Sequence, residues 1–211
     1  MSIRIGIYDF FAFTVPGGLM LLILLGVYGT FGGDPALFLL FYDLGTFYIL
    51  LLILLSYLTG FVANPFLTKW GGLFEQKNME QVVLDRIKSR NPALDVRIEA
   101  KDWGIWFATI RRENLDLAIE IDRNMAVTKM LRGLSAFLFL AGILLIANIT
   151  TDRFSAWWLP ASLGLFICSY AAAYESVQSK KRFFYYIFET AVSKQPPFSS
   201  TGGGGKHADR K

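Results

Sequence analysis

The sequence contains four long apolar stretches, at residues 10–31, 36–64, 130–149 and 154–173. A bilayer has a hydrocarbon core about 30 Å thick, which a helix of about 20 apolar residues spans. Each stretch is long enough for this. Hydrophobic residues make up 54% of the chain, above the usual share in soluble domains. We therefore predict an all-α membrane protein with four transmembrane helices.

The positive charges give this protein a predicted orientation. Of the 21 lysines and arginines, only Arg153 lies in a segment that joins the first stretch to the second or the third to the fourth. Loops rich in lysine and arginine stay on the cytoplasmic side of a membrane. We expect a multi-pass protein of the inner (plasma) membrane, with both termini and the long segment between the second and third stretches in the cytoplasm.

The expected organisation has five parts. They are two transmembrane helices (1–65), a mainly helical cytoplasmic subdomain (66–128), two further transmembrane helices (129–174), a cytoplasmic amphipathic helix (175–195) and a disordered tail (196–211). The helix at 175–195 has bases followed by an apolar stripe, so it either lies on the inner leaflet or packs on the cytoplasmic subdomain.

Within the cytoplasmic subdomain, apolar residues at helical spacing predict an amphipathic helix over residues 73–90. Residues 94–100 alternate apolar and charged side chains, which fits either a strand or a loop. Asp102 is a candidate N-cap for a second helix, which we expect to run unbroken from Trp103 to Ile149 because no proline interrupts it. Such a helix is about 70 Å long and couples the cytoplasmic part rigidly to the membrane.

At two positions in the first half of the chain, the sequence is compatible with two alternative local structures. Pro16 either follows a turn or short kinked helix at residues 8–15, or lies in the first turn of the first span. Asp43 is either an intramembrane carboxylate, which is a functional candidate, or the N-cap of a span over residues 44–64. In the second case residues 36–42 lie on the outer membrane surface.

Small residues at four-residue spacing mark candidate helix contacts. Gly164, Cys168 and Ala172 form one such stripe, and Ser56 and Gly60 form a weaker one. Small side chains let two membrane helices approach closely. The spacing does not distinguish a contact within one chain from a contact between copies, and we expect a homo-oligomer.

Residues suited to catalysis are scarce. The single histidine, His207, lies in the tail, and the single cysteine, Cys168, lies in the fourth stretch. Neither a histidine-based triad nor a histidine metal site can form in an ordered region. We therefore expect no enzymatic activity, no metal and no cofactor.

Two sets of residues are candidates for function. Polar residues in or beside the spans could line a pore formed by several copies; they are Asp43, Thr46, Ser56, Thr59, Asn64 and Asn148. Basic and aromatic residues of the cytoplasmic subdomain could bind a soluble protein, or the phosphates and bases of a nucleotide or oligonucleotide. This second set is Arg86, Arg97, Trp103, Trp106, Arg111 and Arg112.

Two motifs carry a resemblance to a known group. The opening Tyr8-Asp9-Phe10-Phe11 with Pro16-Gly17, and Ser56-Tyr57-Leu58-Thr59-Gly60, resemble small four-pass inner-membrane proteins of bacterial anti-phage defence operons. In that group the membrane component is a homo-oligomeric pore or a sensor paired with a soluble protein. The resemblance implies a channel gated from the cytoplasm or, alternatively, a non-conducting sensor or scaffold that recruits a soluble partner.

Overall fold

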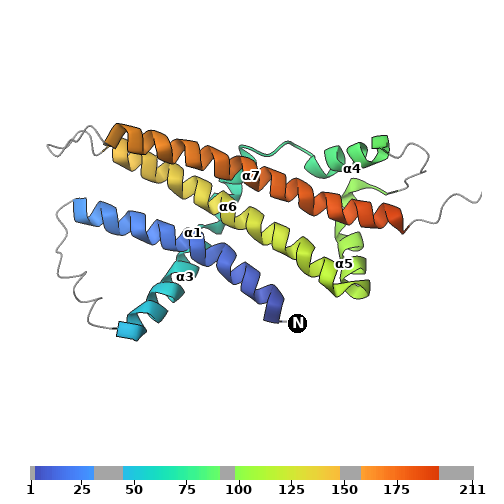
Figure 1. Cartoon of the computed structure of the whole chain (residues 1–211), viewed down its shortest axis with the longest axis horizontal. Helices are drawn as coiled ribbons and strands as arrows, with labels where there is room; N and C mark the ends of the chain where they lie inside the picture. Colours follow the sequence, from blue (N-terminus) through green and yellow to red (C-terminus); the bar gives the residue numbers. More distant parts are fainter. Residues whose placement is uncertain (1–2, 31–44, 91–97, 148–157, 195–211) are drawn as a thin grey trace, which may run out of the picture.

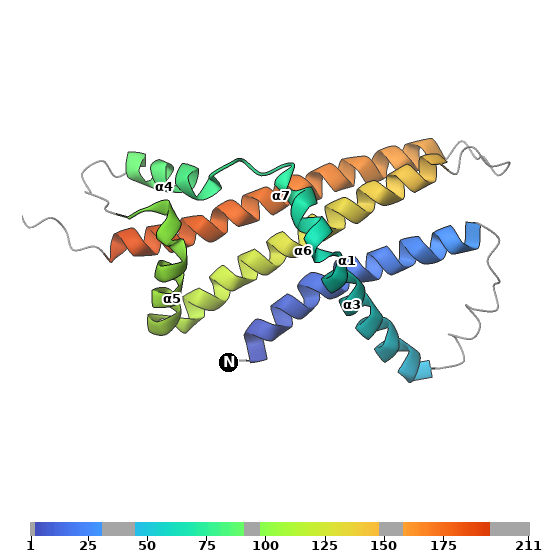
Figure 2. The ribbon, with the colours of Figure 1, turned by 180° about the vertical axis from the view of Figure 1, so that it is seen from behind.

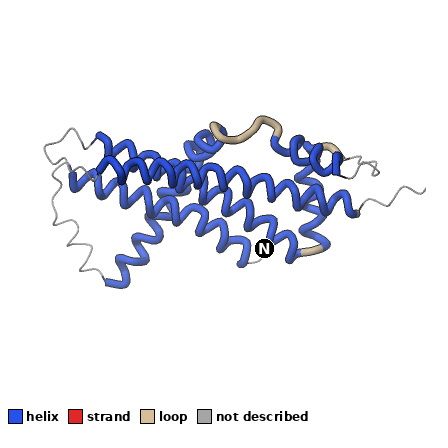
Figure 3. Tube along the Cα trace, turned by 45° about the horizontal axis from the view of Figure 1, so that its top comes forward, coloured by secondary structure: helices blue, strands red, loops and turns tan. Residues whose placement is uncertain are grey.

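The structure, a computed structural model, describes residues 3–30, 45–90, 98–147 and 158–194. Every regular element in these ranges is a helix, which confirms the all-α class for this part of the chain (Figure 3). The elements are α1 (Ile3–Thr30), α3 (Gly45–Gly72), α4 (Met79–Arg90), the short 3-10 helix η1 (Ala100–Asp102), α5 (Trp103–Glu113), α6 (Leu115–Ala147) and α7 (Trp158–Ser193).

Within the described residues, three helices contain stretches long and apolar enough to cross a membrane, at Ile7–Tyr28, Thr46–Gly72 and Leu115–Ala147. These agree with the first three expected spans. The fourth expected stretch begins outside the described residues and continues as the first half of α7. The boundary expected at residue 174 falls inside α7, which is one continuous helix.

Antiparallel packing of α6 against α7 forms the centre of the fold, and the two helices lie side by side along most of their length (Figures 1 and 2). Their contact consists of buried residues at seven-residue intervals, the spacing of an antiparallel helix pair. On α6 these are Ile121, Thr128, Ser135 and Gly142, and on α7 they are Ser162, Ser169, Ser176 and Phe183. We call this set the α6–α7 seam.

Hydrogen bonds fix the register of the α6–α7 seam. Ser169 donates its hydroxyl to the backbone oxygen of Ser135 at 2.8 Å, and Ser176 donates to that of Thr128 at 3.2 Å. Small hydroxyl side chains let the two helices approach closely, and their hydroxyl groups find hydrogen-bond acceptors on the facing helix, as in many membrane helix pairs.

Helices α1 and α3 cross at glycines. A Cβ atom on Gly17 would overlap the backbone of Ser56, and one on Gly60 would overlap the backbone of Phe13. The two backbones therefore touch without intervening side chains. Helix α1 begins at Ile3 and passes through Pro16, so residues 8–15 are helical, not a turn, and Pro16 does not lie in the first turn of the helix. Pro16 instead packs against Gly133 of α6.

One apolar core joins α4, η1, α5, the beginning of α6 and the end of α7. We call this unit the head. The apolar stripe of α7 after residue 182 is fully buried in it, and comprises Phe183, Phe184, Ile187, Phe188, Ala191 and Val192. Of the two alternatives for residues 175–195, the stripe therefore packs on the head.

The unbroken helix expected from Trp103 to Ile149 is wrong. Asn114 has an extended backbone (φ −139°, ψ 92°) and separates α5 from α6. Its side-chain oxygen accepts a hydrogen bond from the backbone N–H of Leu117 at 3.0 Å, which makes Asn114 an N-cap for α6. The cap starts a new helix here, so α5 turns and packs on both α6 and α7 (Figure 1).

Two other boundaries differ from the prediction. Helix α3 continues through Pro65 to Gly72 instead of ending at residue 64, because proline is tolerated in membrane helices where neighbouring groups satisfy the freed backbone. The amphipathic helix begins at Met79 instead of residue 73, since Asn78 has a positive φ of 57°. Asp102 lies at the N-cap position of α5, but its side chain makes no capping bond.

Replacing Asn114 by alanine should destabilise the head by about 1 kcal/mol, because the substitution removes the cap of α6. Thermal unfolding in detergent, followed by circular dichroism, would show a lower midpoint. Ser89→Ala is a suitable control because the exposed Ser89 hydroxyl only bonds Arg86 of its own helix. An unchanged midpoint for the Asn114 variant would show that the cap contributes nothing.

Candidate functional site

A cluster of three charged side chains lies where the membrane-length helices meet the head. Arg132 Nη2 lies 2.6 Å from Glu75 Oε1, and Lys180 Nζ contacts the other oxygen of the same carboxylate. The three side chains are largely buried, with exposed fractions of 17% for Glu75, 13% for Arg132 and 22% for Lys180. We call these three residues the junction.

Each member of the junction comes from a different element. Glu75 lies in the connection between α3 and α4, Arg132 on α6 and Lys180 on α7. A Cβ atom on Gly71 would overlap the Arg132 side chain, so this glycine lets Arg132 lie against the end of α3. One carboxylate therefore holds the end of α3 to both helices of the central pair.

Trp70 reinforces the same connection. Its indole N–H donates to the Ser135 hydroxyl at 3.2 Å, and its ring lies 5.0 Å from that of Phe139, centroid to centroid. Both partners are on α6. The C-terminal end of α3 is thus attached to α6 by a hydrogen bond and a ring contact, and Glu75 just after it adds an ion pair.

A second ion pair attaches α1 to α6. Lys129 Nζ lies 2.8 Å from Asp9 Oδ1, and the same ammonium lies 5.8 Å from the centre of the Phe13 ring. This pair is more exposed than the junction, at 35% for Lys129 and 50% for Asp9. Exposed pairs stabilise a structure little, so the junction is the stronger of the two connections.

The ion pairs of Glu75 and Asp9 connect helices to one another. Both oxygens of Glu75 are bound by cations, so this carboxylate has little capacity left to act as a base. In the described ranges no group of three or more histidine, cysteine, aspartate or glutamate side chains is placed to hold a metal ion. The ion pairs of the junction therefore connect the segment after α3 to α6 and α7.

Four of the six pore-lining candidates lie in the described residues, all of them on α3. Asp43 and Asn148 lie outside the described residues. Thr46 is exposed at the start of α3, Ser56 is buried against α1, and Thr59 and Asn64 are half-buried.

The two stripes of small residues have different surroundings. Ser56 and Gly60 lie in the crossing with α1. Gly164 and Cys168 are exposed, and Ala172 is half-buried. The α7 face that packs on α6 is instead the one bearing Ser162, Ser169 and Ser176.

The ligand-binding candidates of the head that the structure describes differ in burial and in contacts. Trp103 lies edge-on against Phe183 and Phe184, with centroids 5.7 and 5.8 Å apart, and Trp106 also packs on the core of the head. Their rings thus contribute to packing. Arg86 and Arg112 are exposed and Arg111 is half-buried, while Arg97 lies outside the described residues.

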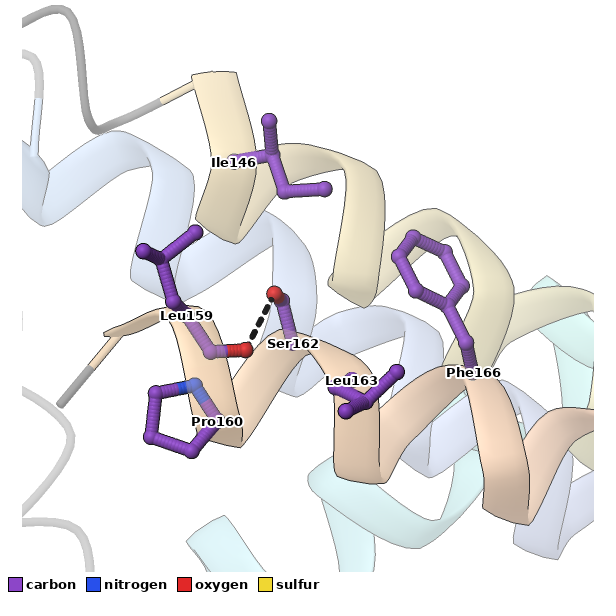
Figure 4. A pocket seen from close by; sticks show the side chains of 6 residues that line it. All are labelled: Ile146, Leu159, Pro160, Ser162, Leu163 and Phe166. Atoms are coloured by element: carbon purple, nitrogen blue, oxygen red, sulfur yellow. Dashed lines mark hydrogen bonds between the residues drawn. The ribbon is translucent and has the colours of Figure 1, made fainter.

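An apolar groove of about 510 Å³ lies between the far ends of α6 and α7 (Figure 4). Its lining is Ile146, Leu159, Pro160, Ser162, Leu163 and Phe166. The single hydroxyl among them, that of Ser162, donates to the backbone oxygen of Leu159 at 2.9 Å. The groove therefore presents hydrocarbon and offers no group for catalysis or ion binding.

No protein-family model matches the chain, and no curated protein or solved structure matches it. The function is therefore argued from the geometry of the chain itself.

The junction and the α6–α7 seam were both missed by the sequence interpretation. A signal for each is present. Arg132 lies two residues inside the third apolar stretch, and an ionisable residue there calls for a partner. Most of the seam is marked in the sequence by hydroxyl or small residues that recur at seven-residue intervals on both helices. Four-residue spacing marks a different face of α7, the one bearing Gly164, Cys168 and Ala172.

Proposed function

We propose that the chain is a four-pass protein of the bacterial inner membrane with cytoplasmic termini. In this proposal the head is cytoplasmic, recruits a soluble partner and is held rigidly to the membrane, as a sensor or scaffold. The charge distribution supports the orientation, since Arg153 is the single lysine or arginine in the two short connections between spans.

One observation carries the proposal: the head and the membrane part share the helices α6 and α7. Ile121 and Phe183 are buried in the core of the head, and Ser135 and Ser169 bond to each other further along the same two helices. At 1.5 Å per residue, α6 and α7 are each about 50 Å long. A partner that binds the head is therefore connected directly to the spans.

The spans themselves resemble an anchor more than a pore. Hydroxyl groups in the described helices mostly bond to backbone oxygens: Thr14 to Phe10 at 2.8 Å, Thr68 to Asn64 at 2.9 Å and Ser162 to Leu159 at 2.9 Å. Between Phe47 and Phe66, the exposed side chains of α3 are mostly large and apolar, as lipid requires. A conducting pore needs polar groups or exposed backbone oxygens along its wall.

The partner-binding surface we propose lies on α4 and α5. Ile105 is 68% exposed, a high value for an isoleucine outside the membrane. Arg86 and Arg112 are exposed on the same two helices. An apolar anchor accompanied by arginines is typical of protein interfaces, and their charge favours an acidic partner. A nucleotide is a weaker candidate, because the Trp103 ring, on which its base would stack, already packs against Phe183 and Phe184.

Co-purification tests this proposal. The full chain, extracted in detergent, is expected to retain a soluble protein encoded beside it. Ile105→Glu combined with Arg112→Glu should reduce the retained amount at least tenfold, because the substitutions place negative charge on the binding surface. Lys77→Glu, an exposed charge reversal in the connection between α3 and α4, is the control. Failure of every soluble neighbour to co-purify with the wild-type chain would contradict recruitment.

A homo-oligomeric channel of anti-phage defence, gated from the cytoplasm, is the second candidate. The observation that favours it is the exposure of apolar side chains at the far half of α3, where Phe47 and Leu50 are 65% and 61% exposed. Together with the stripe of Gly164, Cys168 and Ala172, this leaves room for contact with further copies. The polar lining of such a channel would come from Thr46, Asp43 and Asn148. Both candidates are non-enzymatic and need no cofactor.

A further inference from the structure

Arg132 has a buried donor that is not accounted for. Its Nη2 binds Glu75, but its Nε is buried and has no hydrogen-bond partner among the residues that the structure describes. Leaving a buried donor unpaired costs about 1–3 kcal/mol, and more for a charged group. Buried polar groups in native proteins are therefore nearly always bonded to protein or to ordered water.

A small cavity is lined in part by the Arg132 side chain. Its volume is about 10 Å³, and it is lined by Trp70, Gly71, Phe74, Arg132, Ser135, Ala173, Ser176 and Val177. A single water molecule needs about 10–15 Å³ of such space and two to four polar partners. The cavity is therefore of the size of one water and excludes a phosphate, a lipid headgroup or a nucleotide.

The hydroxyl groups in this cavity have acceptor capacity left. Ser176 donates its hydrogen to the backbone oxygen of Thr128 at 3.2 Å, which leaves its lone pairs available. Ser135 Oγ accepts one bond from the Trp70 indole at 3.2 Å and has a second lone pair. A water that accepts the Arg132 Nε–H can donate one hydrogen to each serine. Three hydrogen bonds are what buried waters typically make.

We propose that one internal water molecule, bound by Arg132 Nε, Ser135 Oγ and Ser176 Oγ, is a fixed component of the junction. This water connects the ion pairs of Glu75 to the hydroxyl groups of the α6–α7 seam. The end of α3 and the central helix pair then share one continuous hydrogen-bond network.

Nuclear magnetic resonance of the full chain in nanodiscs, with nitrogen-15-labelled arginine, tests this site. The Arg132 Nε–H signal, assigned by its loss in Arg132→Lys, should exchange slowly and show a direct cross-peak to a long-lived water. Ser176→Val, which places methyl groups in the cavity, should abolish that cross-peak. Ser193→Val is the control, because the Ser193 hydroxyl is exposed and bonds Thr190 of its own helix.

A slowly exchanging Arg132 Nε–H without any water contact in the wild-type chain would overturn the proposal. The same holds for a high-resolution density map of the wild-type chain in which the cavity is empty or closed. Neither measurement depends on whether the Ser176 variant folds.

Discussion

Replacing Glu75 by glutamine is expected to lower the free energy of unfolding by about 3 kcal/mol, the largest effect of any single charge change in the head or junction. Removing one partner of a buried ion pair leaves the other charge buried and uncompensated. Here two cations, Arg132 and Lys180, lose their common carboxylate. Unfolding of the detergent-solubilised chain by SDS titration, followed by circular dichroism, measures the change.

A matched control and a rescue make the Glu75 prediction specific. Glu99→Gln removes another carboxylate that pairs with a lysine, but both side chains of that pair are more than 60% exposed, so no measurable change is expected. The double variant Glu75→Gln with Lys180→Gln should recover part of the loss, because it removes one of the two stranded cations. Equal stability of Glu75→Gln and the wild type would show that the junction is not a structural connection.

Replacing Gly60 by alanine is expected to separate α1 from α3 and to destabilise the membrane part by about 2–3 kcal/mol. The new methyl group meets the backbone of Phe13, which cannot move aside as a flexible side chain could. Overpacking a close contact costs about 1–3 kcal/mol. The same SDS titration measures the loss of stability.

Two further variants show whether the Gly60 effect comes from the helix crossing. Gly72→Ala changes a glycine of the same helix whose Cβ would have no neighbour within 4 Å, and it should leave stability unchanged. Gly17→Ala should act like Gly60→Ala, and the two together should cost less than their sum because both open the same crossing. Full additivity would mean that the two glycines act at independent places.

The fold class and three of the spans follow from the sequence, because a long apolar stretch has few alternatives to a membrane helix. The choice of packing face on α7 does not. Gly164 and Ser162 are both small, but a hydroxyl gains a hydrogen bond when it faces another helix. Ser169 and Ser176 therefore turn inward and donate to backbone oxygens of α6, while the buried Ser162 donates to Leu159 of its own helix.

The helix break at Asn114 and the junction depend on contacts that are distant in the sequence. Asn114 is compatible with a helix interior, but here it has an extended backbone and caps α6, and α5 packs on α6 and α7. Glu75 and Lys180 are 105 residues apart, so no local pattern pairs them. Arg132, inside an apolar stretch, was the one member that sequence alone could have marked as needing a partner.

Ion flux through liposomes carrying the purified full chain tests most directly whether the membrane part is an anchor. If the head recruits a partner and the spans only hold it in place, flux will not exceed that of empty liposomes, with or without the soluble partner. The exposed apolar side chains of α3, and hydroxyls that bond within their own helices, lead to that result. Flux that rises with the amount of protein, and falls when Thr46 is replaced by valine, would contradict the anchor and favour the channel.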